Sequence, residues 1–300
     1  MDIKNIKTFV RVAELKNFTK AAQELNYVQS TVTMQIQLLE KELGFPLFDR
    51  VGKKISLTDL GREFLSYAYE IIHIFEKAET INKNDTEIKG SLRIGISESL
   101  LFSVLNDLLP DFKNKYKNVN ISIKTGHTFE LLEQIKQNQL DIIYVSKSKN
   151  SDPDINCYYL KKERLVFVAP LDHPLSKAKK VPLEEVFKHE FVVTEKEGIC
   201  YSRLKEMAAQ NGCSLLDVVE IDSVAVLIDL VKNGMGLAFL PEYAVKKQVN
   251  KKEIVLLDVE YPAQYYYSQI LCHKSRWLSP WAKGFVSLIE QARVQTKKHP

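Results

Sequence analysis

Hydrophobic residues near the N-terminus recur at the spacing of a helix. Four of them lie four, three and four positions apart, so they form one stripe on a helix that begins near Val28. These residues are Val32, Ile36, Leu39 and Leu43. Gly44 ends the helix, because glycine readily takes the left-handed conformation found after a helix C-terminus. A short alanine-rich helix from Phe18, with Thr19 placed to cap it, precedes a tight turn.

The face opposite this stripe carries short polar side chains and one methionine. The candidate DNA contacts on and beside that face are Gln29, Ser30, Thr31, Thr33, Met34 and Gln37. A helix that is buried on one side and lined by hydrogen-bonding side chains on the other suits the major groove of DNA. An ordinary amphipathic surface helix is the alternative, although such a helix usually carries more Glu and Lys.

The next apolar positions, up to Thr58, predict two short strands around a basic turn. Arg50, Lys53 and Lys54 lie at or beside the turn, and Gly52 frees its backbone. A basic hairpin beside a helix pair has the layout of a wing that contacts phosphates or enters the minor groove. A solvated hairpin with incidental lysines is the alternative. Residues 1–58 are thus predicted to form a winged helix-turn-helix domain.

A second helical stripe follows, and Thr58 is placed to cap it. The pattern predicts a linker helix to about Asn84, with a hinge over residues 82–87, inside a linker segment of residues 59–88. Such a long striped helix is expected to pair with its twin from another subunit. The expected dimer contacts are Phe64, Ala68, Ile71, Phe75 and Ala78. Packing on the C-terminal part of its own chain is the alternative.

Beyond the hinge, short apolar strands alternate with helical segments. This order predicts α/β lobes with largely parallel sheets and right-handed crossovers. One strand is expected at residues 165–169 and a return strand at residues 265–271. A helix beginning at Ser279 and Pro280 is expected to close the chain. The predicted division is lobe 1 at residues 89–163 plus 269–300, and lobe 2 at residues 164–268.

Ligands of open α/β sheets bind beyond the C-terminal ends of the strands, where helix N-termini present backbone N–H groups. The residues predicted at these strand ends are Ser97, Ser99, Thr125, Gly126, Thr128, Thr194 and Ser223. Simple helix caps are the alternative for each hydroxyl, and the more favoured one for Thr128 and Ser223. Glu98 is expected to repel a carboxylate ligand unless it is neutralised or turned away.

The loop after Thr194 adds Cys200 and Arg203 as candidate ligand contacts. Arg203 can pair with an anionic ligand or with Glu195, and a helix start with a surface arginine is the alternative. The cysteines form no Cys-x-x-Cys pair and have no nearby histidine at metal-ligand spacing. No metal site and no cofactor are therefore expected, and the thiols are read chiefly as small buried hydrophobic groups.

Composition changes this picture little. The chain has 300 residues, 45% hydrophobic and 27% charged, with a net charge of +4. That charge is too small to indicate nucleic-acid binding by itself, so the prediction rests on local basic groups. No apolar run approaches the ~20 residues of a membrane span, and the N-terminus lacks a signal-peptide core. We therefore expect a cytoplasmic protein with no membrane partner.

The N-terminal segment resembles the LysR-type transcriptional regulators over about sixty residues. The matching residues are Phe9, Ala13, Phe18, Thr19, Ala21, Ala22, Leu25, Gln29, Val32, Thr33, Ile36, Leu39, Glu40, Leu43, Gly44, Leu47, Phe48, Arg50, Leu57, Thr58 and Gly61. The chain departs from the family at Ser30, where proline is common, and at Met34, where arginine is common. Met34 removes a positive charge from the predicted groove-facing surface.

The resemblance implies a DNA-binding transcription regulator with an effector domain similar to periplasmic binding proteins. A small-molecule effector is expected between its two lobes, and Ser99, Thr125 and Thr194 align with effector-contacting positions of the family. It also implies a homodimer or homotetramer on an interrupted inverted repeat of double-stranded DNA, with RNA polymerase as a candidate partner.

Two other classes of function compete with a regulator. One is an enzyme or bilobal small-molecule-binding protein with an accessory DNA-binding domain, and the other is a transport binding protein. The sequence contains no Gly-x-Ser-x-Gly, His-Glu-x-x-His or phosphate-binding glycine-rich loop. Neither alternative gives the winged helix a role, and the missing signal peptide also opposes transport. We therefore expect no enzymatic activity.

Overall fold

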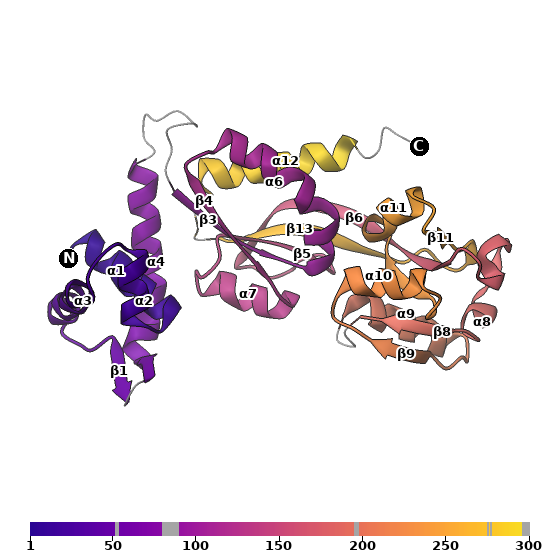
Figure 1. Cartoon of the computed structure of the whole chain (residues 1–300), viewed down its shortest axis with the longest axis horizontal. Helices are drawn as coiled ribbons and strands as arrows, with labels where there is room; N and C mark the ends of the chain where they lie inside the picture. Colours follow the sequence, from indigo (N-terminus) through magenta and orange to yellow (C-terminus); the bar gives the residue numbers. More distant parts are fainter. Residues whose placement is uncertain (52–53, 80–89, 195–197, 275, 277, 296–300) are drawn as a thin grey trace.

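The computed structural model describes residues 1–51, 54–79, 90–194, 198–274, 276 and 278–295. Figure 1 shows a small helical domain at the N-terminus, a long helix beside it, and a larger α/β part that extends away from both. The predicted hinge at residues 82–87 lies outside the described residues.

The N-terminal domain has the predicted helix-turn-helix. It contains α1 (Ile3–Leu15), α2 (Phe18–Glu24) and α3 (Gln29–Leu43), and Gly44 ends α3 with a φ of 80°. Val32, Ile36 and Leu39 are fully buried, so the apolar stripe packs inward as predicted. The prediction that Thr19 caps α2 is wrong. Helix α2 begins one residue earlier, so Asn17 holds the cap position and accepts a hydrogen bond from the Lys20 N–H at 3.0 Å.

The predicted wing is an antiparallel hairpin of β1 (Phe48–Val51) and β2 (Lys54–Leu57). Val51 pairs with Lys54, and residues 52 and 53 between the strands lie outside the described residues. Thr58 caps the next helix, α4 (Asp59–Glu79), because its Oγ1 accepts a hydrogen bond from the Gly61 N–H at 2.8 Å.

Part of the predicted dimer face of α4 is covered within the chain. Phe64 is 7% exposed and Ala68 is fully buried, because both pack on the N-terminal domain, and the Phe64 ring lies 5.3 Å from that of Phe9. The prediction that these two residues face a second subunit is therefore wrong. Ile71 is half-buried against the same core, whereas Phe75 and Ala78 are exposed. The first half of α4 thus buries one side on the N-terminal domain of its own chain.

Lobe 1 is built on parallel strands, as predicted. Strand β3 (Gly90–Ile96) lies between β4 (Val119–Thr125) and β5 (Ile142–Lys147), and parallel pairing joins it to both. Helices α6 (Asn106–Lys115) and α12 (Pro280–Gln295) cover one face of this sheet, and α7 (Thr128–Lys136) covers the other (Figure 1). Between β3 and α6 the chain forms α5 (Glu98–Leu100) and a π-helical segment, η1 (Leu101–Leu105).

Two long strands cross from lobe 1 into lobe 2. Strand β6 (Ile155–Pro170) pairs antiparallel with β13 (Tyr265–His273) along most of its first half. The strand predicted at residues 165–169 is the second half of β6. There it pairs with β10 (Ala238–Pro241) and β11 (Ile254–Leu256). The crossing strands thus make one sheet continuous between the lobes.

The rest of lobe 2 packs on both sides of that sheet extension. The apolar core on one side includes α9 (Ile199–Gln210), and the core on the other includes α10 (Val224–Lys232) and α11 (Glu242–Asn250). Strand β8 (Glu190–Val193) pairs in parallel with β9 (Leu216–Glu220). The smaller elements are a 3-10 turn (Pro174–Lys177), β7 (Val181–Pro182), α8 (Leu183–Val186) and β12 (Val259–Glu260).

Candidate DNA-binding face and effector cleft

Helix α3 presents the predicted DNA contacts on one accessible face. Gln29, Ser30, Met34 and Gln37 are exposed, and Thr31 and Thr33 are half-buried. Two contacts at the N-terminal end of α3 orient this face. The Thr19 hydroxyl donates to Oε1 of Gln29 at 3.0 Å, and the Thr33 hydroxyl donates to the Gln29 backbone carbonyl at 3.0 Å. A carboxamide held at a helix N-terminus suits recognition of a base edge.

The wing projects from the same domain next to the start of α4 (Figure 1). Lys53 and the side chains of Arg50 and Lys54 lie outside what the structure describes, so their predicted phosphate contacts stay predictions. The backbone register nevertheless places Arg50 and Lys54 on neighbouring strands, on either side of residues 52 and 53 in the chain.

The predicted effector residues gather around one cavity of about 960 Å³ between the lobes. The predicted residues that line it are Ser97, Ser99, Thr125, Gly126, Thr128, Thr194, Cys200 and Ser223. Ser97, Ser99 and Thr125 follow or end strands of lobe 1, and Thr194 follows β8 of lobe 2. The N-termini of α7, α9 and α10 also reach this cavity, which we call the effector cleft.

Arg203 is the predicted residue that does not line the effector cleft. It lies one turn into α9, and its Nη1 pairs with Oε2 of Glu206 at 2.7 Å. The prediction that Arg203 contacts a ligand in this cleft is therefore wrong for this arrangement. Its other suggested partner, Glu195, lies outside the described residues.

A hydroxyl cluster beneath the effector cleft was not predicted. The Tyr243 hydroxyl lies 3.0 Å from Oγ of Ser99 and 3.0 Å from Oγ of Ser146, and it accepts a hydrogen bond from the Tyr266 hydroxyl at 3.1 Å. Burial raises the pKa of Tyr243, so its hydroxyl stays neutral. Tyr243 belongs to α11 of lobe 2, whereas both serines belong to lobe 1, so the cluster joins the lobes.

Glu98 also lines the effector cleft, where lobe 2 binds its carboxylate. Its carboxylate accepts hydrogen bonds from Ser223 and from the backbone of Val224, both in lobe 2. Lys147 also lines the effector cleft, and burial lowers the pKa of its amine. The strand-end rule could have found Ser146 and Lys147, because both follow the buried run of β5.

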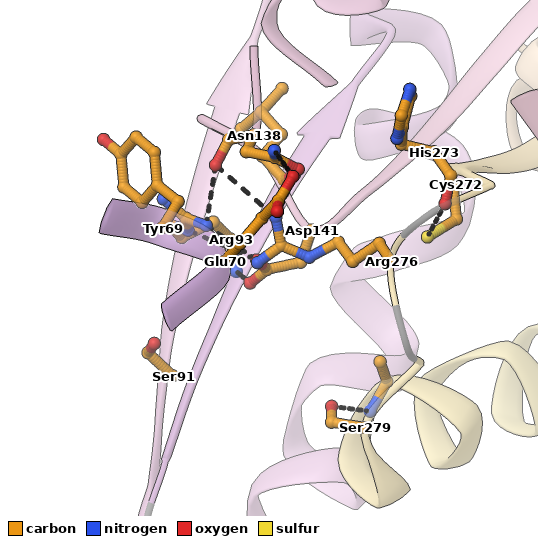
Figure 2. Close-up of polar contacts among 12 residues, drawn as sticks. Tyr69, Glu70, Ser91, Arg93, Asn138, Asp141, Cys272, His273, Arg276 and Ser279 are labelled. Carbon is orange, nitrogen blue, oxygen red and sulfur yellow. Dashed lines mark hydrogen bonds and ion pairs between the residues drawn. The ribbon is translucent and has the colours of Figure 1, made fainter. Parts of the chain in front are cut away.

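A buried ion cluster lies away from the effector cleft, where β3 and the start of β5 approach α4. Figure 2 shows Arg93 and Arg276 converging on Asp141, with Nη2 of Arg93 at 2.9 Å from Oδ1 of Asp141. Burial raises the pKa of Asp141, but the two guanidinium groups outweigh it and hold the pKa below its usual value. The Arg93 guanidinium also stacks 4.4 Å from the Tyr69 ring centre, and Nδ2 of Asn138 donates to Glu70 at 3.3 Å.

Other kinds of site find little support in the part of the chain that the structure describes. It contains no group of three or more His, Cys, Asp or Glu side chains able to hold a metal ion. Within the same residues no helix has both the length and the apolar character needed to cross a bilayer. Cys157 is exposed, Cys200 and Cys213 are partly buried, and Cys272 is buried.

Comparison with known proteins identifies both parts of the chain. Residues 3–62 match the family model for the bacterial regulatory helix-turn-helix protein, lysR family, and residues 85–293 match the LysR substrate binding domain. The uncharacterized HTH-type transcriptional regulator YwqM of Bacillus subtilis (strain 168) is 32% identical over 289 residues, which cover 96% of this chain and 98% of YwqM.

Solved structures agree in fold. A cysteine-to-aspartate variant of full-length OxyR from Pseudomonas aeruginosa has a TM-score of 0.75 at 19% identity, covering 98% of this chain and 95% of OxyR. The regulatory domain of CcmR from Synechocystis PCC6803, in complex with 2-PG, has a TM-score of 0.59 at 20% identity, covering 71% and 100%. The chain therefore belongs to the LysR family of transcriptional regulators, DNA-binding proteins whose activity a small-molecule effector switches.

Proposed function

We propose that this protein binds an interrupted inverted repeat of double-stranded DNA as a dimer, and that an effector entering between its lobes changes that binding. The observation that carries the proposal is the convergence of hydroxyl-bearing strand ends from both lobes on one cavity. An effector shifts an equilibrium only by its differential affinity for two arrangements, and contacts to both lobes provide that difference. The lobe boundaries at residues 163/164 and 268/269 are part of this proposal.

The effector class that suits the cleft is a small polar molecule. Ser99 and Thr125 offer hydroxyls from lobe 1, Thr194 offers one from lobe 2, and Lys147 adds an amine. The complex of CcmR with 2-PG supports a small ligand at this kind of domain. We assign the chain no catalytic role. Because it binds DNA, we place it in the cytoplasm. RNA polymerase is a candidate partner at the promoter.

The experiment starts from the full-length protein and a random double-stranded DNA library. Selection should enrich a two-fold repeat, and fluorescence anisotropy then gives the affinity for that operator. Thermal-shift screening of polar metabolites identifies the effector by its stabilisation of the protein. Random sequences with no shared repeat after selection would contradict specific DNA binding, and metabolites without effect would contradict only the effector assignment.

Ser99→Ala tests the effector contact directly. We expect the variant to lose most of the effector-dependent change in operator affinity, because Ser99 lines the effector cleft. Its operator affinity without effector should stay close to the wild-type value, because Ser99 lies outside the DNA-binding domain. Ser176→Ala, in the 3-10 turn of lobe 2 outside the lining of that cleft, is the matched control. An unaltered response in Ser99→Ala would remove Ser99 from the site.

A further inference from the structure

One carboxylate of lobe 1 is bound by lobe 2 across the effector cleft. Oε1 of Glu98 accepts a hydrogen bond from Oγ of Ser223 at 2.9 Å, and Oε2 accepts one from the Val224 N–H at 2.6 Å. Glu98 directly follows β3 and its neighbour Ser97, whereas Ser223 and Val224 begin α10. The contact therefore joins residues far apart in the sequence and on opposite sides of the cavity.

The position of this carboxylate is electrostatically favourable. The first N–H groups of a helix have no partner within the helix, and its N-terminus favours negative charge. Ser223 already caps α10, because its Oγ accepts from the Val226 N–H at 3.5 Å. Since α10 has its own cap, the main consequence of the Glu98 contact is to hold one lobe against the other.

The next residue makes a second contact between the lobes. Ser99 lies 3.0 Å from the Tyr243 hydroxyl, and Tyr243 belongs to α11. Consecutive residues after β3 thus hold two different helices of lobe 2. Glu98, Ser99, Ser223 and Val224 all line the effector cleft, so a change in its width must alter these contacts. The ion pair of Asp107 with Lys247 also crosses between the lobes, but it is exposed and therefore contributes little.

We propose that Glu98 is a bridge that sets the resting width of the effector cleft, by binding its carboxylate to Ser223 and the α10 N-terminus. The regulatory consequence rests on the proposed function: an effector that uses the same donors must first release Glu98. The bridge itself is independent of any effector, so it can be tested on the protein without ligand and without DNA.

The thiol of Cys200 provides the readout, because Cys200 lines the cleft from lobe 2. In the full-length protein we would measure iodoacetamide alkylation of each cysteine by mass spectrometry. In the Glu98→Gln variant, iodoacetamide should alkylate Cys200 roughly three- to tenfold faster than in wild type. The variant loses a charge-assisted hydrogen bond between the lobes, so the cleft that Cys200 lines opens more readily. Cys157 and Cys213, which do not line this cleft, should keep their rates.

Glu130→Gln is the matched control. It removes the same charge from the exposed first turn of α7, and α7 starts at the same cleft, so Cys200 should react at the wild-type rate. Ser223→Ala removes one donor to Glu98 and should give a smaller, still selective rise. Wild-type reactivity of Cys200 in Glu98→Gln would overturn the bridge. Equal acceleration of all three thiols would overturn it too, because Glu98 would then stabilise the whole fold.

Discussion

Gln29 is the residue at which base recognition can be separated from general attraction to DNA. The Thr19 hydroxyl fixes its amide oxygen at the start of α3, on the exposed face. We expect Gln29→Ala to weaken operator binding by about 1–3 kcal/mol and to leave binding to random DNA nearly unchanged. Anisotropy titrations on both DNAs measure this, with Gln210→Ala on α9 as the control. Equal losses on both DNAs would mean that Gln29 contacts no base.

Asp141 is expected to stabilise lobe 1 far more than a surface carboxylate does. Asp141→Asn leaves the buried guanidinium groups of Arg93 and Arg276 without their common partner (Figure 2), at a cost of about 3–5 kcal/mol. Because its folded pKa lies below its unfolded pKa, the stabilisation is present above the unfolded pKa and is lost as pH falls through the folded one. Urea unfolding measures it, and Asp258→Asn, in an exposed ion pair, should change stability by about 1 kcal/mol or less.

Single residues also show how far the sequence could predict the candidate site. Strand-end reasoning found Ser99, Thr125 and Thr194, because a buried strand marks its own end. The prediction for Arg203, made from the loop after Thr194, failed, since the helix phase that turns this side chain toward Glu206 depends on where α9 begins. Strand-end reasoning missed Tyr243, whose hydroxyl lies beneath the cleft because α11 packs against lobe 1, and no local pattern reports such a contact.

At the scale of elements, the uncovered side of α4 differs from the predicted one. Leu60, Tyr67 and Ile74 are 48%, 53% and 65% exposed, and their spacing of seven residues places them on one seam. We propose this seam, continued by Phe75, as the dimer contact. Ile74→Glu should therefore shift the protein toward monomer in analytical ultracentrifugation. Leu171→Glu, which places the same charge on an exposed leucine of lobe 2, should not.

The elements themselves were predicted with uneven success. Helix α3 was predicted well because its apolar spacing and Gly44 both have local causes. Strand β6 was found only in its second half, since its first half, residues 156–162, is mostly exposed and gains its strand conformation by pairing with β13. The helical segment between β3 and β4 is interrupted by the π-helical turn η1, for which the sequence carries no signal that we recognise.

At the scale of the whole molecule, β3 and β5 connect two functional regions. Strand β5 starts next to Asp141, and β3 contacts the same cluster at Arg93 in its middle. Both strands end at the effector cleft, with Ser97 after β3 and Lys147 in β5. Rigid strands of this kind can transmit a shift at the cleft to the contact with the linker helix, provided that this contact has two arrangements. The contact between α4 and lobe 1 includes the stacking of Arg93 on Tyr69 and the hydrogen bond from Asn138 to Glu70.

Glu76 is expected to make that contact sensitive to pH. Burial, followed by the negative charge of Asp141, raises its pKa to about 7, although Lys7, Arg93 and Arg276 act in the opposite direction. Because the pKa is higher in the docked arrangement, docking of α4 on lobe 1 is favoured at low pH. The contribution is complete below the ordinary glutamate pKa of 4.5 and is lost as pH rises through about 7.

Hydrogen exchange of the α4 segment at residues 69–76, corrected for the intrinsic pH dependence of exchange, measures this docking. We expect protection in wild type to fall between about pH 5.5 and pH 8. Glu76→Gln should keep the protection at both values, because a neutral amide cannot ionise. His73 lines the same cavity between α4 and lobe 1, so His73→Gln serves as the control. If His73→Gln removed the pH dependence and Glu76→Gln preserved it, the histidine would be the titrating group at this contact.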